Sequence, residues 1–170
     1  MCLNLLRAGR IAVIAFILAS LFQNYCITSY RVSGNSMLPN FTDGDRVVVA
    51  SLPAFLLSPK DGDTVIVKGP DGDTLIKRVA ASPGETIEIK HSSVYRNGQL
   101  VAETIPAEMA RCDDYAPRTL HQDEFFLLGD HRRISIDSRD FGPVKRDAIV
   151  GRVILRMPAG EALPAHARVP

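Results

Sequence analysis

The sequence is poor in the residue types that build metal sites and disulfide frameworks. It has no tryptophan, three cysteines and four histidines in 170 residues. The cysteines lack Cys-x-x-Cys spacing and cannot all pair, and the histidines are scattered without the spacing of metal ligands. We therefore expect no disulfide framework, no metal and no cofactor.

An excess of charge of one sign is also missing. Twenty basic residues face nineteen acidic ones, which gives a formal net charge of +1. This balance produces no extended electric field, so it argues against nucleic acid as a partner and requires that specificity come from a defined site. The length suits one domain with a sizeable core, preceded by a short N-terminal segment.

The N-terminal part lacks acidic residues and contains an apolar run. Residues 11–22 include a single polar side chain and follow Arg7 and Arg10. A bilayer core takes about 20 residues, so the run would have to continue to Tyr30 to cross it. We expect residues 1–29 to form one transmembrane anchor, with the arginines on the cytoplasmic side and the rest of the chain on the opposite side of the membrane.

Two other interpretations fit this run less well. Leu18, Ala19 and Ser20 resemble the small-residue cleavage site of a secretory signal peptide, and the apolar length suits the hydrophobic region of such a peptide. A helix buried in the core would have to bury every face at the very start of a small domain. We favour the anchor because the extended segment reaches the length of a membrane crossing.

From residue 30 onward the pattern changes to short strand-like segments. Turn-forming residues separate these segments at the spacing of antiparallel sheets. The predicted strands cover residues 46–50, 64–68, 74–80, 86–90, 93–96, 124–128 and 149–156. We expect a mainly β domain over residues 30–157, followed by a disordered and dispensable tail over residues 158–170.

Turn chemistry divides the β domain further. Three Asp-Gly-Asp triplets could suggest calcium, but none carries the remaining ligands of an EF-hand loop, so we predict turns. They lie at residues 43–45, 61–63 and 71–73. Asn97 and Gly98 predict another hairpin. Residues 91–124 are expected to form a small inserted cap that is rich in loops over residues 103–123.

Lys77 lies in the predicted strand 74–80, where alternate side chains share a face. It therefore lies between Leu75 and Val79 on one face. A lysine on an edge strand commonly guards against aggregation with its charge in water, and the strand pattern alone favours that interpretation. A lysine buried beside a nucleophile would instead have a lowered pKa, and its neutral amine could act as a general base.

Ser36 is the candidate nucleophile, in the segment SGNSMLP at residues 33–39. The first four residues of this segment are by themselves typical of a turn. Pro39 stiffens the chain, whereas Met37 and Leu38 offer apolar side chains to substrate, membrane or core. An apolar tripeptide after the serine is not needed in a plain polar linker.

Residues 129–143 form the third unusual stretch, with six charged residues and a histidine. A solvated loop is the simpler interpretation. However, Ser135 lies between two isoleucines, and Asp137 could pair with Arg139 across a turn. These features predict a loop that holds a fixed shape.

Together the three stretches resemble the type I signal peptidases, which are membrane-bound Ser-Lys proteases and include the bacterial leader peptidases and the mitochondrial inner membrane protease. The resemblance extends from about residue 30 to residue 156. The matching motifs, in chain order, are Ser36-Met37-Leu38-Pro39, Lys77-Arg78-Val79, and Gly129-Asp130 with Ser135 and Asp137-Ser138-Arg139. Each motif is weak or moderate alone, and their order makes the match specific.

The resemblance implies a role for each matched position. Ser36 would attack the scissile carbonyl and contribute its backbone N–H to the oxyanion hole, and Lys77 would take the hydroxyl proton. Ser135 would hydrogen-bond the lysine amine. The residues implied to brace the site through ion pairs are Arg78, Asp130, Asp137 and Arg139. The residues expected to contact substrate or membrane are Met37, Leu38 and Pro39.

The resemblance also implies the fold, the reaction and the partners. The fold would be a coiled antiparallel β-sheet body with an N-terminal membrane helix and a small inserted cap. The reaction would remove signal peptides from exported preproteins through an acyl-enzyme, without metal or cofactor. The substrate would bind as an added strand, with small residues at the first and third positions before the cut. The partners are then preproteins and the lipid bilayer.

Some positions depart from the family pattern. Gly34 stands where many members have a serine whose hydroxyl completes the oxyanion hole, which leaves the second oxyanion donor open. The other departures are Asn40 for threonine, Ala81 for glycine, Glu85 for aspartate and His131 for asparagine. None of these departures removes a proton-transfer group.

Several alternatives remain at this point. A catalytically silent, membrane-anchored β-domain could bind peptides, but it has no need of both a nucleophile and a base. A Ser-His-Asp arrangement would use His131 and Asp137. The self-cleaving Ser-Lys repressors carry a DNA-binding helix-turn-helix, whereas this chain has an apolar segment. For localisation we favour the outer side of a bacterial plasma membrane over a mitochondrial inner membrane facing the intermembrane space.

Overall fold

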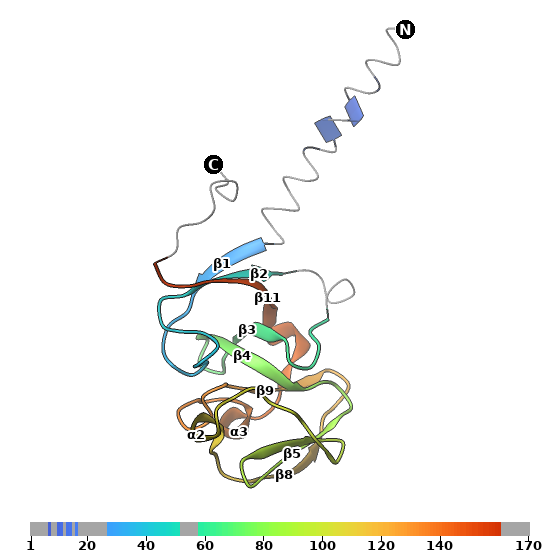
Figure 1. Cartoon of the computed structure of the whole chain (residues 1–170). Helices are drawn as coiled ribbons and strands as arrows, with labels where there is room; N and C mark the ends of the chain where they lie inside the picture. Colours follow the sequence, from blue (N-terminus) through green and yellow to red (C-terminus); the bar gives the residue numbers. More distant parts are fainter. Residues whose placement is uncertain are drawn as a thin grey trace.

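The computed structural model describes residues 27–51 and 58–160, together with Arg7, Arg10, Ile11, Val13, Ile14 and Phe16. The body of the described chain consists of two antiparallel sheets. Figure 1 shows the larger sheet above and the smaller one below. The prediction of a mainly β protein is confirmed.

Seven strands form the larger sheet, in the order β1-β2-β11-β3-β4-β9-β10. Their bounds are β1 Ile27–Arg31, β2 Arg46–Ala50, β3 Thr64–Lys68, β4 Thr74–Ala81, β9 Glu124–Leu128, β10 Val144–Lys145 and β11 Ile149–Met157. The register shifts where β11 meets β2 and β3 and where β4 meets β9. Such irregularities increase the local twist, which explains why the sheet curls (Figure 1).

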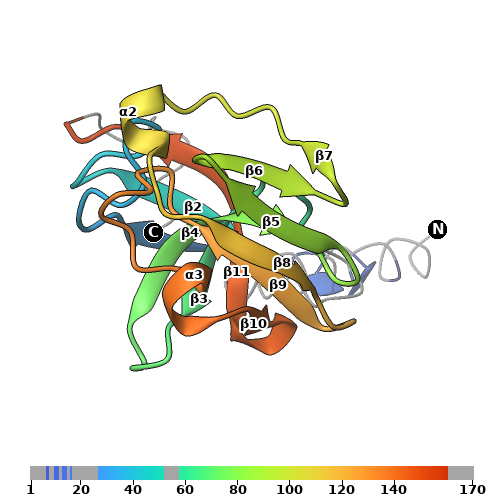
Figure 2. The same ribbon diagram turned by 90° about the horizontal axis from the view of Figure 1, so that it is seen from below.

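Four strands form the smaller sheet, in the order β7-β6-β5-β8. Their bounds are β5 Thr86–Lys90, β6 Ser93–Arg96, β7 Gln99–Leu100 and β8 Tyr115–Thr119. Ile87 and Ile89 of β5 pack in one cluster with Phe126 and Leu128 of β9. This cluster holds the smaller sheet against the larger one, and Figure 2 shows the smaller sheet and α2 (Ala107–Ala110) from below.

Five of the seven predicted strands have the predicted bounds, and β4 and β11 each extend one residue further. β8 was not predicted, and it lies in the stretch expected to be rich in loops. Pro117 argues against a strand in the sequence, because proline cannot donate a ladder hydrogen bond. β8 is one of the two edge strands of its sheet, where a proline is tolerated. The predicted cap of residues 91–124 therefore contains most of the smaller sheet, which begins earlier, at Thr86.

The apolar N-terminal segment does not continue to Tyr30. The strand β1 pairs antiparallel with β2, and Tyr30 lies opposite Val47. β-Branched and aromatic side chains favour a strand here. The anchor prediction is therefore wrong for residues 27–29, and most of residues 1–26 lies outside the described residues. Within the described part of the chain, we find no helix with both the length and the apolar character needed to span a membrane.

The predicted turns are present. Gly44, Gly62 and Gly72, the central residues of the three Asp-Gly-Asp triplets, have φ values of 88°, 82° and 85°. Asn97 and Gly98 join β6 to β7 with φ values of 52° and 78°, as a two-residue hairpin turn requires.

The folded body extends further toward the C-terminus than we predicted. Met157 ends β11 and is buried, and the backbone N–H of Ala159 donates to Asp45 Oδ1 at 2.9 Å. The first residues of the predicted tail are thus held to the body. Residues 161–170 lie outside the described residues.

Candidate active site

The nucleophile segment, residues 33–45, connects β1 to β2. Met37 is 1% exposed and packs in the core of the larger sheet, and its neighbour Ser36 is half-buried. Met37 is therefore a core residue, and the predicted contact of its side chain with substrate or membrane is wrong. Leu38 is half-buried and Pro39 is exposed, so the prediction stays open for these two residues.

Lys77 of β4 lies beside Ser36. Its side chain is buried, with the whole residue 3% exposed, and its Nζ is 3.2 Å from Ser36 Oγ. Burial lowers the pKa of Lys77 below its ordinary value, because the charged amine loses water, although the carboxylate of Asp137 partly opposes the shift. The alternative of an exposed edge-strand lysine is therefore wrong for this structure.

Arg78, the next residue of β4, forms a two-point ion pair with Asp130. Arg78 Nε lies 2.7 Å from Asp130 Oδ1, and Arg78 Nη2 lies 2.6 Å from Asp130 Oδ2. Asp130 is fully buried and also accepts a hydrogen bond from Asn40 Nδ2 at 2.8 Å. The hydrogen bonds to Asp130 raise the pKa of Arg78. These contacts tie the nucleophile segment to β4 and to residues 129–143, which we name the catalytic loop.

A second ion pair holds the catalytic loop itself. Arg139 Nε lies 2.8 Å from Asp137 Oδ1, and Arg139 Nη2 lies 2.9 Å from Asp137 Oδ2. Asp137 is fully buried, caps the short helix α3 (Ser138–Phe141) and accepts from the backbone N–H of Gly129 at 2.9 Å. Arg139 also donates to the carbonyl oxygens of Arg132 and Ser135. The pairing expected from the sequence is present, and it fixes the shape of the loop.

Ser135 lies at the site, but its hydroxyl does not meet the lysine. Ser135 is 7% exposed, and its Oγ has no hydrogen-bond partner among the described residues. The hydrogen bond to Lys77 that the resemblance implied is thus absent from this structure.

Gly129 explains how the catalytic loop reaches Ser36. A Cβ atom at Gly129 would lie 2.1 Å from Ser135 Oγ and 2.7 Å from the carbonyl oxygen of Ser36, which no real side chain tolerates. The backbone N–H of His131 donates to the same Ser36 oxygen at 3.0 Å. Glycine is therefore required for the loop to pack directly on the nucleophile segment.

The structure does not favour a Ser-His-Asp arrangement. In such a triad the aspartate accepts a hydrogen bond from histidine Nδ1. Here His131 Nδ1 is buried and has no partner among the described residues, while the oxygens of Asp137 accept from Arg139 and Gly129. Lys77 is the basic side chain within hydrogen-bond distance of Ser36 Oγ.

A cavity of about 150 Å³ opens beside the pair, between the end of β1 and the start of β4. Its apolar lining includes Val32, Val47 and Ile66, and both Ser36 and Lys77 border it. Thr74–Lys77 pair with β3 on one side, whereas β9 pairs only from Arg78 onward on the other. The first half of β4 therefore presents an unpaired edge to this cavity.

Some residues at the site were not predicted to act there. Asn40 was noted only as a departure from the family pattern, yet it bonds Asp130. Arg156 of β11 donates to Asp45 Oδ2 at 2.7 Å and to the carbonyl of Asn40, and its guanidinium lies 5.7 Å from the ring centre of Phe41. Sequence pattern gives no signal for this contact, because the partners are more than 100 positions apart.

Comparisons with known proteins agree with this geometry. The family described as "Signal peptidase, peptidase S26" matches residues 5–158. Signal peptidase I T of Bacillus subtilis is 33% identical over 157 residues, which cover 86% of this chain and 81% of the relative. Signal peptidase I V of the same organism is 34% identical over 152 residues, covering 82% and 90%.

A solved structure is also similar. The crystal structure of a signal peptidase I from Enterococcus faecalis has 27% sequence identity and a TM-score of 0.51, covering 58% of this chain and 98% of that chain. With the match over residues 5–158, these findings show that the chain belongs to the signal peptidase family, the serine proteases that remove signal peptides.

Proposed function

We propose that this chain cleaves signal peptides from exported preproteins with Ser36 as the nucleophile and Lys77 as the general base. The observation that carries the proposal is the 3.2 Å contact between Lys77 Nζ and Ser36 Oγ, made by an amine that is almost completely buried. Burial lowers the pKa of Lys77, so less free energy is needed to present a neutral amine to the hydroxyl.

The reaction follows from this pair. Ser36 Oγ bonds to the scissile carbonyl carbon while Lys77 Nζ takes the hydroxyl proton, and the backbone N–H of Ser36 donates to the oxyanion. The lysine proton then passes to the leaving amine as the C–N bond breaks, which leaves the signal peptide esterified to Ser36. Neutral Lys77 next takes a proton from water, the hydroxide attacks the ester, and the proton returns to Ser36 Oγ.

The substrate binds as an extended strand along the unpaired edge of Thr74–Lys77. Main-chain hydrogen bonds to that edge supply affinity without regard to sequence, and the cavity supplies specificity. A cavity of about 150 Å³ with a partly apolar lining suits small side chains near the cut.

The remaining matched residues position the pair. The Arg78–Asp130 and Asp137–Arg139 ion pairs hold the catalytic loop against the nucleophile segment. We assign Ser135 the role of holding the lysine amine during the reaction, since its buried hydroxyl lies next to the Ser36 main chain and has no other partner among the described residues.

The chain acts at a bacterial plasma membrane, with residues 30–157 on the outer side. The described residues of the N-terminal segment support anchoring, because Ile11, Val13, Ile14 and Phe16 are helical and each is more than half exposed. Exposed apolar helical residues are costly in water and favourable in lipid. The bacterial origin of the compared relatives favours this membrane over the mitochondrial one.

The test is cleavage of a model preprotein in neutral detergent. Ser36→Ala and Lys77→Ala should each abolish cleavage, whereas His131→Ala should retain most of it. The rate of the unmodified enzyme should rise with pH as Lys77 loses its proton. If His131→Ala is as inactive as Ser36→Ala, the general base is His131 and not Lys77. Binding of the preprotein without cleavage at any pH would indicate a silent peptide-binding domain.

A further inference from the structure

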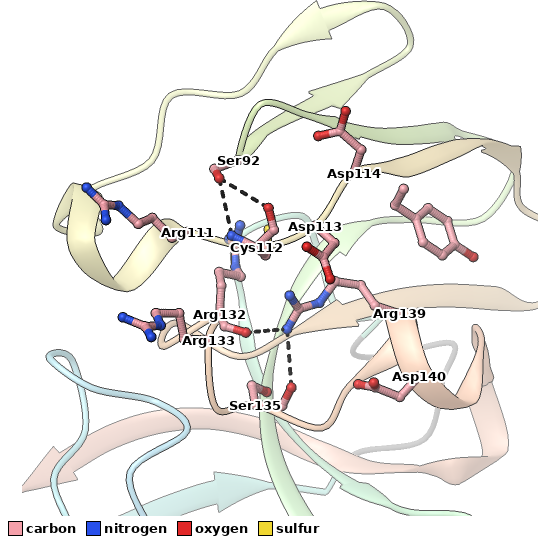
Figure 3. Close-up of a pocket in the computed structure, with 11 residues that line it drawn as sticks. Ser92, Arg111, Cys112, Asp113, Asp114, Arg132, Arg133, Ser135, Arg139 and Asp140 are labelled. Atoms are coloured by element: carbon pink, nitrogen blue, oxygen red, sulfur yellow. Dashed lines mark hydrogen bonds between the residues drawn. The ribbon is translucent and has the colours of Figure 1, made fainter.

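A large pocket borders the catalytic loop and shares no lining residue with the substrate cavity, and the proposed function gives it no role. Its volume is about 750 Å³, and it lies between the loop that follows α2 and the catalytic loop (Figure 3). Seven of its eleven lining residues are charged. Such a lining suits a polar peptide and disfavours an apolar one.

This pocket begins at the catalytic site. Ser135 belongs to its lining. A Cβ atom placed on Gly129 would lie within 2.7 Å of both Ser135 Oγ and the Ser36 carbonyl oxygen, so Ser135 and Ser36 are close to each other. The substrate cavity contains Ser36 and Lys77 and shares no lining residue with the pocket. The two spaces therefore flank the point where the scissile bond must lie.

The sheet also directs a bound peptide toward this pocket. A peptide along Thr74–Lys77 cannot continue along β4, because β9 occupies that edge from Arg78 onward. It must leave the sheet at Lys77, where the catalytic loop follows the end of β9. The chain beyond the scissile bond therefore passes over Ser135 toward the pocket.

Most charges in the pocket already have partners. Arg132 pairs with Glu103 and Arg139 with Asp137, while Asp114 and Asp140 accept backbone hydrogen bonds. Arg111, Arg133 and Asp113 are exposed and their side chains form no ion pair or hydrogen bond within the described residues, so two positive charges and one negative charge are left over.

The two unpaired arginines lie at one edge of the pocket. Figure 3 shows Arg111, from the end of α2, and Arg133, from the catalytic loop, extending toward the same side, with Asp113 turned instead toward Arg139. A guanidinium group forms strong, charge-assisted hydrogen bonds with a carboxylate, so an acidic side chain of a bound peptide can pair with either arginine at this edge of the pocket.

We propose that this pocket binds the preprotein segment that follows the scissile bond, and that Arg111 and Arg133 favour an acidic side chain in that segment. The inference rests on the proposed function, because it names the mature side of the same substrate. The enzyme then recognises a different property on each side of the cut: small side-chain size before it and a carboxylate after it.

The test uses two preproteins that share one signal peptide and differ only in two residues shortly after the cut, which are aspartates in one and lysines in the other. The measured quantity is the ratio of their kcat/KM values in neutral detergent. The unmodified enzyme should prefer the acidic substrate by about fivefold or more at low salt, and the preference should fall as salt is added. Arg111→Glu and Arg133→Glu should each lower the ratio, and the double variant should reverse it.

Lys145→Glu provides the matched control. It makes the same change in net charge on the edge strand β10, where the lysine is 70% exposed, and it should keep the ratio of the unmodified enzyme. Active arginine variants that retain the full ratio would overturn the inference and leave the proposed function intact. An enzyme that cuts neither substrate would overturn both.

Discussion

Removal of water from a single amine is the central feature at the scale of the residue. Lys77 has neighbouring carboxylates, Asp137 and Asp130, which favour its charged form, and burial outweighs them, so that its pKa lies below the ordinary value. The protein thus buries an amine that would be more stable in water, and this burial places the amine beside Ser36. Such a group should cost stability.

Lys77→Met should therefore stabilise the protein while abolishing cleavage. Between the lowered pKa of folded Lys77 and the ordinary value of 10.5, the unfolded chain binds one more proton than the folded chain, so the free energy of unfolding rises with pH in that window. The variant should be more stable by about 1–3 kcal/mol near neutral pH, and the difference should shrink as the pH approaches 10.5. Urea unfolding at several pH values measures both effects. A variant less stable than the unmodified protein at neutral pH would contradict this account.

Gly129→Ala should disable the site through sterics alone. The new methyl group would overlap Ser135 Oγ and the Ser36 carbonyl oxygen, and the second of these is backbone that cannot rotate away. A displacement of about 1 Å at the reacting atoms can cost 100-fold in rate, so we expect kcat to fall by about that factor or more.

Gly69→Ala is the control for this substitution. Its Cβ would meet the flexible end of Leu75 at 3.0 Å, which can move aside. Leu75 borders the substrate cavity, so KM is expected to change, but the control should retain kcat within about twofold because nothing at the reacting atoms is displaced. Equal activity of the two alanine variants would show that the close packing of the catalytic loop is unimportant.

At the scale of the element, the catalytic loop depends on one carboxylate. Asp137 caps α3, pairs with Arg139 and holds the Gly129 N–H, and it is fully buried. Asp137→Ala would leave Arg139, 15% exposed at its side chain, without its partner. Losing one partner of a buried ion pair typically costs about 3–5 kcal/mol, and we expect a loss of stability in that range.

Asp123→Ala is a suitable comparison for Asp137→Ala. Asp123 is 58% exposed at its side chain and lies 3.9 Å from Lys145, so its removal should change stability by less than about 1 kcal/mol. Thermal or urea unfolding distinguishes the two variants. Comparable losses in both would mean that the burial of Asp137 does not govern the stability of the loop.

The elements also show what the sequence could and could not predict. Strands such as Thr64–Lys68 and Glu124–Leu128 were predicted with correct bounds, because each is a continuous apolar run between turn residues. β1 was missed because its residues follow an apolar segment directly, and the sequence pattern predicts that the same helix continues through them. β8 was missed because Pro117 interrupts it. Ser36, Lys77 and the ion pairs came from motifs, whereas the core position of Met37 and the unpartnered Ser135 hydroxyl depend on packing, which the sequence does not reveal.

At the scale of the whole molecule, Arg156 connects the last strand to the nucleophile segment. It reaches Asp45, the Asn40 carbonyl and the Phe41 ring from β11. Asp45 is 1% exposed, and burial would raise its pKa, but hydrogen bonds from Thr42, Ala159 and Arg156 lower it overall. The stability contributed by Asp45 is thus present near neutral pH and is lost as the pH falls through its lowered pKa.

Arg156→Ala should lower the free energy of unfolding by about 1.5–3 kcal/mol, the range for a hydrogen bond to a charged group, and should lower kcat because the chain next to Ser36 loses its support. Arg152→Ala on the same strand is the control, since its contact with Asp63 is longer, at 3.4 Å, and partly exposed. The control should lose less than about 1 kcal/mol. Arg156→Ala with full stability and full kcat would show that the C-terminal strand does not support the site.

The most direct measurement is the titration of the Lys77 amine in the folded protein. NMR of a Ser36→Ala variant with isotope-labelled lysine, with the signal identified by its absence in Lys77→Met, reports this protonation without catalysis. We expect a midpoint below 10.5, and a rising limb of kcat/KM in the active enzyme near the same pH. An amine that titrates together with the exposed lysines, at about 10.4 or above, would contradict the role of Lys77 as a buried general base.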